Sequence, residues 1–571
     1  MTKTPLLFLL LFCSYFSATA QQVFSTNKYP LVDFRSPLDI VPPALAGSFG
    51  ELRSNHFHSG MDYRTNQREG YPVYAIADGF ISRLRVQNSG FGQALYINHP
   101  NGYTSVYGHL SRFNSKISQQ VKALQYQKKS FEIDEFPNET LIPVRKGDVI
   151  AYTGNTGSSG GPHLHFEIRD TKSEATINPQ LFGLEIPDNI PPVIYSIYTY
   201  NLNKKPFNEF TPKQFIPVSG ASGNYRLSKS NTLNLGGEIG FGIVTTDRHN
   251  GASGLNGVYS IELFVDGKPV YTSALERFQF ENSKGINAHI DYPLYLSTKR
   301  SVQKSFVDPG NPLLIYSNLV NRGRIDFNDG ALHQLKYIVT DSKGNKSTLA
   351  FQVKAEKREE SISSVVTGVF SYAKENEFNN DQIKVIIPKG TLYNDLNFVY
   401  KTQPRPTGNA YSAIHQIHNN NTPLHIGFEL WIKADSSLSK YKDKALIVSS
   451  GRASQGGYYE NGYVKAKPRN FGSFLIAIDT IPPSVLPQNI TNGKSMAGIS
   501  KMSFKIRDKL SGIKSFNGYI DGRWVLMEFD AKTASLWHTF DELTTPGKHQ
   551  LELIVADMKD NNRNYSITFY K

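Results

Sequence analysis

Two histidines separated by one residue follow a run of glycines. Residues 160–167 read Gly-Gly-Pro-His-Leu-His-Phe-Glu. Alternate residues of an extended strand point to the same face, so His163 and His165 can enter one cavity. Leu164 and Phe166 would then pack on the opposite face. The glycines upstream allow a tight turn that leaves the end of the strand open. The pair therefore predicts a site that two imidazoles share, such as a metal site.

Two other segments carry groups that a metal site on this strand would need. His58 and Asp62 are held close by a bend of small residues, and His109 stands where an apolar strand ends. Catalytic zinc usually has three protein ligands from histidine and carboxylate side chains, with water in the fourth position. The metal lowers the pKa of that water to about 7, which makes it a nucleophile. The sequence contains no HExxH motif, which excludes the helical zincin arrangement.

Together the three motifs resemble the M23 metallopeptidases of the lysostaphin or LytM type, whose pattern is HxxxD, a histidine before leucine, and then HxH. The likeness extends over residues 47–182. The resemblance implies that one zinc ion is bound by His58, Asp62 and His165. It also implies that His109 and His163 lie beside the metal as catalytic histidines. These two would share proton transfer and stabilisation of the oxyanion.

Other polar residues near these motifs have alternative interpretations. Glu167 shares a strand face with the histidine pair, so it either orients an imidazole or is a charge on an edge strand. His56 could support the site from behind but is not expected to be a ligand. His99 precedes a turn and is interpreted as structural. The remaining histidines lack such spacing and are also expected to be structural: His249, His289, His333, His415, His418, His425, His538 and His549.

The first 20 residues resemble a secretory signal peptide. Lys3 gives a positive start, residues 6–12 form a short apolar core, and residues 18–20 are a small-residue cleavage site. Cys13, the only cysteine, lies in this segment within a poor lipobox, so the mature chain would contain neither thiol nor disulfide. We expect an exported protein that is periplasmic, associated with the cell envelope or secreted.

Length and composition predict several β-rich domains. The chain has 571 residues, with 31 Tyr, 35 Phe, 45 Gly and 30 Pro, which favours strands and turns. After the predicted signal, no stretch is long and apolar enough for a transmembrane segment. The net charge of +13 is dispersed and lacks an aromatic-basic motif, so no nucleic-acid partner is expected. Attraction to an anionic envelope polymer is the better interpretation.

The predicted fold class is all-β: an antiparallel-sheet LytM-type peptidase domain followed by immunoglobulin-like β-sandwich domains. The expected order is an extended lead-in (21–46), the M23 domain (47–187), a sandwich (188–356), a β-rich unit of uncertain type (361–477) and a second sandwich (479–571). The two sandwiches share an internal repeat. Its matching pieces are 188–192 with 479–483, the Asp-Gly turns 266–267 with 521–522, and 339–345 with 555–561.

Two stretches within residues 47–187 affect the interpretation. Asn101-Gly102 between two apolar runs predicts a tight hairpin. The strands around it also resemble biotinyl and lipoyl carrier domains, but no lysine stands at a hairpin tip with its recognition residues, so only the architecture is shared. Residues 111–143 depart from the compact family pattern. We expect a long loop there, either a substrate lip or a surface elaboration.

The expected function is that of a zinc endopeptidase acting on the peptide part of bacterial peptidoglycan. The β domains would position it on the wall or on an envelope protein partner. A first alternative is a catalytically silent LytM-type binder that activates a cell-wall amidase. Such proteins typically lose metal ligands, whereas this chain keeps the full set. A second alternative is an envelope scaffold or adhesin that carries the peptidase as a passenger.

Overall fold

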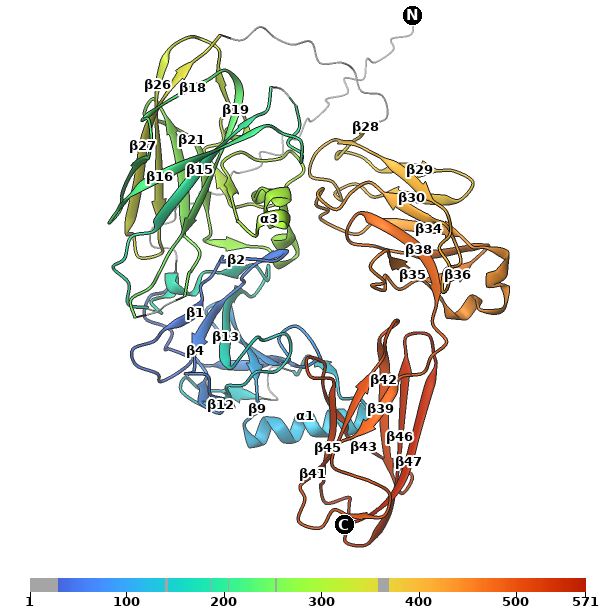
Figure 1. Ribbon diagram of the computed structural model, residues 1–571. Helices are drawn as coiled ribbons and strands as arrows, with labels where there is room; N and C mark the ends of the chain where they lie inside the picture. Colours follow the sequence, from blue (N-terminus) through green and yellow to red (C-terminus); the bar gives the residue numbers. More distant parts are fainter. Residues whose placement is uncertain (1–28, 139–141, 185, 204, 252–253, 358–368) are drawn as a thin grey trace, which may run out of the picture.

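The computed structural model describes residues 29–138, 142–184, 186–203, 205–251, 254–357 and 369–571, together with most side chains in them (Figure 1). The predicted signal peptide lies outside the described residues. Strands dominate, and four large hydrophobic cores follow one another along the chain. The all-β prediction is confirmed. Among the described helices, none combines the length and apolarity that crossing a bilayer requires.

The first core lies beneath an antiparallel sheet. Its strand order is β1 (Leu45–Gly47), β4 (Met61–Arg64), β13 (His163–Asp170), β8 (Tyr103–Leu110), β7 (Gln93–Asn98), β6 (Gly79–Val86) and β10 (Ile133–Glu135). Smaller elements complete the unit: β11 (Pro143–Val144), β14 (Thr176–Ile177), the sheet of β5 (Pro72–Tyr74), β12 (Val149–Tyr152) and β9 (Arg112–Phe113), and the hairpin of β2 (Leu52–Arg53) and β3 (His56–Phe57). Leu164 and Phe166 are fully buried, as the alternation predicts. The Asn101-Gly102 hairpin joins β7 to β8.

The prediction of a long loop over residues 111–143 is wrong. Helix α1 (Ser115–Lys128) begins at Asn114, whose side chain accepts a hydrogen bond from the Ile117 amide at 2.9 Å. Only a narrow stripe of the helix is buried, including Ile117 and Val121. Because polar residues surround this short apolar stripe, the sequence gives little sign of a helix here. The chain then adds β10 to the edge of the main sheet, so the segment is part of the folded unit.

The second core belongs to a β-sandwich. Its strands are β15 (Val193–Asn201), β16 (Lys213–Ala221), β17 (Asn224–Leu227), β18 (Thr232–Leu235), β19 (Gly237–Thr246), β20 (Ser260–Val265), β21 (Lys268–Ala274), β23 (Gln303–Lys304), β24 (Tyr316–Ser317), β25 (Ile325–Phe327), β26 (Leu332–Thr340) and β27 (Lys346–Ala355). The first half of β16 pairs with β15 and its second half with β17, so this strand passes from one layer to the other. Helices α2 (Ile286–His289) and α3 (Tyr292–Thr298) lie at one end.

The sandwich is joined tightly to the first unit. Strand β22 (Arg277–Phe278) pairs with β14, so backbone hydrogen bonds cross between the two units. Phe49, which precedes the β2–β3 hairpin, and Phe57 of β3 pack against Leu275 and Phe278 of the sandwich. The hairpin is therefore held by the sandwich as much as by its own sheet.

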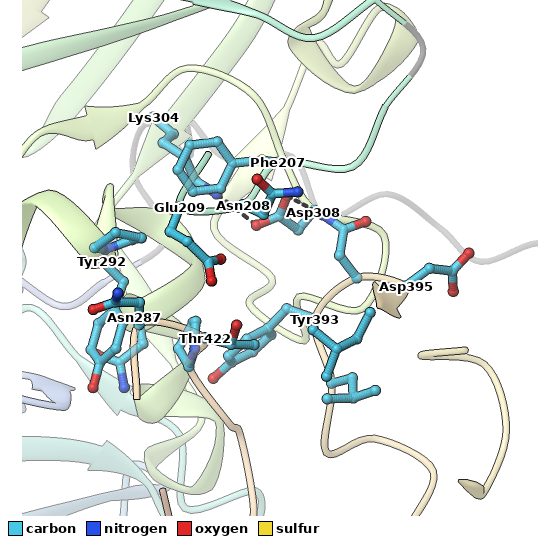
Figure 2. A pocket seen from close by; sticks show the side chains of 16 residues that line it. Phe207, Asn208, Glu209, Asn287, Tyr292, Lys304, Asp308, Tyr393, Asp395 and Thr422 are labelled. Atoms are coloured by element: carbon cyan, nitrogen blue, oxygen red, sulfur yellow. Dashed lines mark hydrogen bonds and ion pairs between the residues drawn. The ribbon is translucent and has the colours of Figure 1, made fainter. Parts of the chain in front are cut away.

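Two further units complete the chain. The third has one sheet of β29 (Asn376–Asn379), β30 (Ile383–Ile387), β34 (Glu429–Lys433), β37 (Tyr463–Ala466) and β36 (Tyr458–Glu460), and another of β32 (Tyr400–Gln403), β33 (Ile414–Ile417), β38 (Gly472–Ile478) and β35 (Ala445–Ser449). The last unit also has two sheets. One contains, in spatial order, β39 (Ser484–Pro487), β41 (Lys501–Arg507), β45 (Ser535–Thr539) and β44 (Glu528–Asp530). The other contains β40 (Lys494–Ser495), β47 (Asn562–Tyr570), β46 (Lys548–Asp557), β42 (Ile513–Ile520) and β43 (Arg523–Val525). Figure 2 shows a pocket between the first sandwich and the third unit, with Tyr292 and Tyr393 in its lining. At this pocket, Asn394 Nδ2 donates to Asp308 Oδ1 at 2.7 Å.

The two sandwiches repeat details as well as shape. Their Asp-Gly turns both close hairpins, β20–β21 and β42–β43, and both aspartates have positive φ. A histidine on the neighbouring strand binds each aspartate: His333 lies 2.7 Å from Asp266, and His549 lies 2.6 Å from Asp521. The predicted turns are confirmed. The immunoglobulin-like assignment stays a prediction.

The last sandwich returns to the first unit and closes a ring of domains (Figure 1). Tyr126 of α1 donates a 2.6 Å hydrogen bond to Asp541, and Lys122 Nζ lies 3.0 Å from the same carboxylate. Tyr126 also packs edge-to-face on Trp524. Helix α1 thus serves as the docking surface for the end of the chain.

Candidate metal centre

Strand pairing brings the predicted site residues together. His165 on β13 is opposite Asp62 on β4, and on its other side it is opposite Gly108 on β8. His109 therefore lies beside the same strand end, next to His163. His58 follows β3, at the base of the hairpin. All five side chains lie at one end of the sheet.

Three donor atoms form a compact triangle. His58 Nε2 lies 3.0 Å from Asp62 Oδ1 and 3.1 Å from His165 Nδ1. The third side, from Asp62 Oδ1 to His165 Nδ1, measures 2.9 Å. All three residues are buried. This histidine–carboxylate group can hold a metal ion.

Outer hydrogen bonds orient the two imidazoles of the triangle. His58 Nδ1 lies 2.7 Å from the Ser48 carbonyl oxygen, which can only accept, so Nδ1 carries the proton and Nε2 faces the triangle unprotonated. His165 Nε2 lies 3.0 Å from Glu167 Oε1, so its Nδ1 is free in the same way when the ring is neutral. Glu167 is itself held by Arg169 at 2.6 Å and by Ser59 Oγ. Of the two interpretations of Glu167, this contact supports the orienting one.

The electrostatics of the triangle favour a positive charge. Burial alone would lower the pKa of His165, but its hydrogen bonds to Asp62 and Glu167 outweigh burial and raise that pKa to about 9. Burial opposes ionisation of Asp62, yet its neighbours, His58 first, hold the pKa of that carboxyl well below its usual range. A proton or a cation is therefore attracted to the same point between the three donors.

The other two predicted histidines lie beside the triangle. His163 Nε2 is buried, makes no hydrogen bond among the described residues and lies 3.4 Å from Asp62 Oδ1, while its Nδ1 lies 2.8 Å from the Gly161 carbonyl oxygen. His109 Nδ1 lies 2.9 Å from the Thr156 carbonyl oxygen, and its ring is 4.8 Å from that of His163. Burial, and then the charges of the neighbouring histidines, lower the pKa of His109 to about 3. Both rings are thus held with Nδ1 protonated and Nε2 as the acceptor.

Sequence reasoning missed two contacts at this centre. Arg53 reaches across from the hairpin and donates to Asp62 Oδ2 at 2.6 Å. The ring of Phe91 stacks on His165 at 4.8 Å. Neither residue has a spacing that relates it to the motifs. By contrast, His56 is exposed, and its ring makes a hydrogen bond to the nearby Ser54 carbonyl oxygen. His99 makes hydrogen bonds to the Asp78 carbonyl oxygen and to Ser105 Oγ, in agreement with a structural role.

The glycine-rich turn before β13 forms the rim of the centre. Gly157 has φ of +67°, and a Cβ there would lie 2.3 Å from the Gly92 backbone nitrogen, so only glycine fits. Lys532 of the last sandwich donates to the carbonyl oxygens of Asn155 and, at 3.2 Å, Ser159 on this rim. The last sandwich therefore contacts the rim of the metal centre.

Comparison with known families identifies two parts of the chain. Residues 56–126 and 139–179 match the model of peptidase family M23. Residues 56–179 form an M23 domain. The third unit, of uncertain type from its sequence, matches the Zu5-like domain over residues 367–479.

Individual curated relatives match a part of the chain. The chain is 34% identical over 137 residues to the DD-carboxypeptidase/endopeptidase Mpg of Neisseria meningitidis serogroup B, which is 24% of this chain and 25% of Mpg. It is 30% identical over 140 residues to the peptidoglycan DD-endopeptidase ShyC of Vibrio cholerae, which is 23% of this chain and 26% of ShyC. The chain thus spans about a quarter of these relatives. The solved catalytic domain of lysostaphin from Staphylococcus simulans is 25% identical, with 24% of this chain and 87% of that domain covered and a TM-score of 0.18.

Proposed function

We propose that the M23 domain is a zinc-dependent endopeptidase that hydrolyses peptide cross-links or stem peptides of bacterial peptidoglycan. The observation that carries the proposal is the triangle of His58 Nε2, Asp62 Oδ1 and His165 Nδ1, with each imidazole turned so that its free nitrogen faces inward. The likeness to Mpg, a DD-carboxypeptidase/endopeptidase, and to ShyC, a peptidoglycan DD-endopeptidase, supports a wall peptide as substrate. An exported location follows from such a substrate and from the predicted signal peptide.

The donors fit zinc in number, type and spacing. Ligands about 2.0–2.1 Å from a tetrahedral ion are separated by roughly 3.3 Å, close to the 2.9–3.1 Å sides of this triangle. His58, Asp62 and His165 would hold the ion. When bound there, zinc would supply an acidified water and polarise the scissile carbonyl.

The protein's own residues would then handle the proton. His109 and His163 have Nδ1 fixed on backbone carbonyls, so each can accept a proton only at Nε2. A histidine protonated in this way can donate to the oxyanion or to the leaving amine. Burial, and then the charges of the neighbouring histidines, keep the pKa of His109 low, so its Nε2 is unprotonated at physiological pH. Phe91 and the buried surroundings keep other water away from His165.

The test is the digestion of isolated peptidoglycan by the purified mature protein, with products resolved by mass. We expect new peptide ends, and we expect their loss in Asp62→Asn, which removes the ligand charge. Asp134→Asn, at a half-exposed ion pair with Arg83 on the same domain, is the matched control and should retain activity. If the zinc-loaded wild-type protein binds peptidoglycan but releases no peptide, the proposal is wrong and the silent-binder alternative gains support.

One observation favours the silent-binder alternative. Lys532 of the last sandwich donates to the Ser159 carbonyl oxygen on the rim of the metal centre. This contact would suit a domain whose site stays covered until a partner binds. Stimulation of a wall amidase by the zinc-free protein would distinguish this role from peptidase activity.

A further inference from the structure

The sheet face that holds the metal centre continues into a groove. Along β13, His165, Glu167 and Arg169 alternate with residues of the first core, so their side chains share the outer face of the sheet. On β6, Arg83 and Arg85 alternate with core residues in the same way. A groove of about 550 Å³ lies on this face, and the three arginines line it. The metal centre and the groove therefore lie on one surface of the M23 domain.

The groove lies beside the metal centre. Arg83 is opposite Tyr96 on β7, and Tyr96 is opposite Val106 on β8, the neighbour of β13. Phe91 joins the two sites, because its ring stacks on His165 at 4.8 Å and also lines the groove. An extended peptide advances about 3.3 Å per residue, so residues near a scissile bond at the metal can enter the groove.

The first sandwich supplies one wall of the groove. Phe280 and Glu281, at the start of η2 (Phe280–Gly285), line it although they belong to the sandwich. Arg169 Cζ lies 5.6 Å from the ring centroids of both Tyr96 and Phe280. Phe280 is 50% exposed, so its ring is available to pack against a ligand. The groove thus forms where the M23 domain and the sandwich meet.

Two cations of the groove keep free donors. Arg83 donates two hydrogen bonds to Asp134, both at 2.6 Å. Arg85 lies 3.6 Å from the same carboxylate, but its side chain donates no hydrogen bond within the described part of the chain. Lys172 also lines the groove, and its ammonium group is exposed and makes no ion pair with any described residue. Because one carboxylate serves two arginines, Arg85 and Lys172 can bind a further anion.

The acidic side chains nearby do not occupy these donors. Glu167 is buried and binds Arg169 at 2.6 Å. Glu174 and Glu281 line the groove, but both are exposed, where water and salt screen their charges. The Arg85 side chain is 32% exposed, so its charge is screened less. A guanidinium presents parallel N–H groups that match a carboxylate. Arg85 is therefore the principal group left to bind a ligand, and the matching ligand is a carboxylate.

We propose that the groove is a subsite for a carboxylate of the peptide substrate, bound by Arg85 with help from Lys172, while Phe280 packs on apolar atoms of the peptide. The inference rests on the proposed function, since the peptides of peptidoglycan carry free carboxylates. Arg85 then selects substrates that carry such a group near the scissile bond. The first sandwich takes part in this selection, because it holds Phe280 at the groove.

The test compares one soluble wall peptide that has free carboxylates with the same peptide after these groups are converted to primary amides. Binding is measured by calorimetry on the full mature chain carrying Asp62→Asn, so that cleavage does not interfere. The acid peptide should bind more tightly than the amide peptide, and added salt should reduce this preference. When Arg85→Gln is added, the affinity for the acid peptide should fall about tenfold, the scale of a hydrogen bond to a charged group. The affinity for the amide peptide should stay unchanged.

Cleavage by the zinc-loaded chain with an intact metal centre gives a second measurement. Arg85→Gln should raise KM for the acid peptide by about tenfold and leave kcat near its wild-type value, whereas a structural role would affect both peptides alike. Asp134→Asn keeps both arginines and removes the charge that they share, so it should bind the acid peptide at least as tightly as wild type. Arg145→Gln, an exposed arginine on the turn between β11 and β12, is the matched control.

Equal affinity of the Asp62→Asn protein for the acid and amide peptides would overturn the proposal, as would an equal loss of both peptides in Arg85→Gln. Binding of dextran sulfate without a preference for the acid peptide would assign the groove to a polyanion and would also overturn it. If Arg85→Gln does not fold, Lys172→Gln provides the same test. A preference for the acid peptide, in a protein whose wild-type form cleaves neither peptide, would support the subsite although the proposed function had failed.

Discussion

The guanidinium of Arg53 binds Oδ2 of Asp62 at 2.6 Å, on the side of the carboxylate that faces away from His58 and His165. With Oδ2 occupied, only Oδ1 is presented to the two imidazole nitrogens. Arg53 belongs to a hairpin whose flanking phenylalanines pack on the first sandwich. The geometry of the metal centre thus depends on a domain that carries none of its ligands.

Arg53→Ala should weaken zinc binding without unfolding the protein. Loss of a group that orients a ligand typically costs 10- to 100-fold in metal affinity, and we expect a loss of about that size in competition with a chromogenic chelator. Arg112→Ala, an exposed arginine of the same domain that lies over Tyr152, is the control. A rise in affinity would mean instead that Arg53 competes with the metal for Asp62.

The contacts of the last sandwich with α1 and with the rim should limit access to the metal centre. Asp541→Ala removes the acceptor of Tyr126 and the partner of Lys122. Combined with Lys532→Ala, it should open the ring and increase the radius of gyration in solution scattering. Access of small wall peptides to the rim at Ser159 should then improve, and their cleavage rate should rise. Lys548→Ala, an exposed lysine elsewhere in the same sandwich, should change neither measurement. An unaltered radius in the double variant would show that other contacts hold the ring.

Much of the site could be predicted because it depends on local chain geometry. His163 and His165 share a face through simple alternation, and Asn101-Gly102 fixes the neighbouring hairpin. Arg53 and Lys532 could not be predicted, since their places depend on how separate units dock. Helix α1 was missed because its apolar stripe is short and lies among lysines and glutamines.

His289 should make the first sandwich less stable in mild acid. The neutral ring is satisfied, with Gln303 Oε1 at 3.0 Å from Nε2 and Tyr316 OH at 3.0 Å from Nδ1. Burial lowers its pKa from 6.5 to about 4. Between these pH values the unfolded chain binds the proton and the folded chain does not. The contribution of the neutral His289 ring to the free energy of unfolding is therefore fully present above pH 6.5 and declines as pH falls toward 4. From pH 7.5 to 5.0 this loss is about 2 kcal/mol, at 1.36 kcal/mol per pH unit.

Urea unfolding of wild type and His289→Gln at pH 7.5 and pH 5.0 measures the effect. Because the variant lacks this titration, the difference in free energy of unfolding between the two proteins should be about 2 kcal/mol smaller at pH 5.0 than at pH 7.5. His333→Gln is the control of opposite sign. The hydrogen bond that the His333 ring donates to Asp266 raises the pKa of His333, so its contribution to the free energy of unfolding is present at low pH and is lost as pH rises. A wild-type to variant difference that is independent of pH would contradict the assignment of a neutral, buried His289.

Three alanine variants separate the ligand histidine from the two beside it. His165→Ala removes one of three donors, so zinc content and peptide cleavage should fall together. His109→Ala should keep near-normal zinc, because its Nδ1 is bound to Thr156 and it is not part of the donor triangle. Its turnover should nevertheless fall by about a hundredfold or more, the scale for a lost acid–base or oxyanion group. His163→Ala should behave like His109→Ala, since its Nε2, which makes no hydrogen bond among the described residues, is 3.4 Å from Asp62 without belonging to the triangle.

Zinc content, measured by metal analysis, is compared with the cleavage rate of each variant to decide the assignment. Loss of zinc in His109→Ala, or full activity in His163→Ala, would reverse the roles, whereas His99→Ala, outside the centre, should affect neither directly.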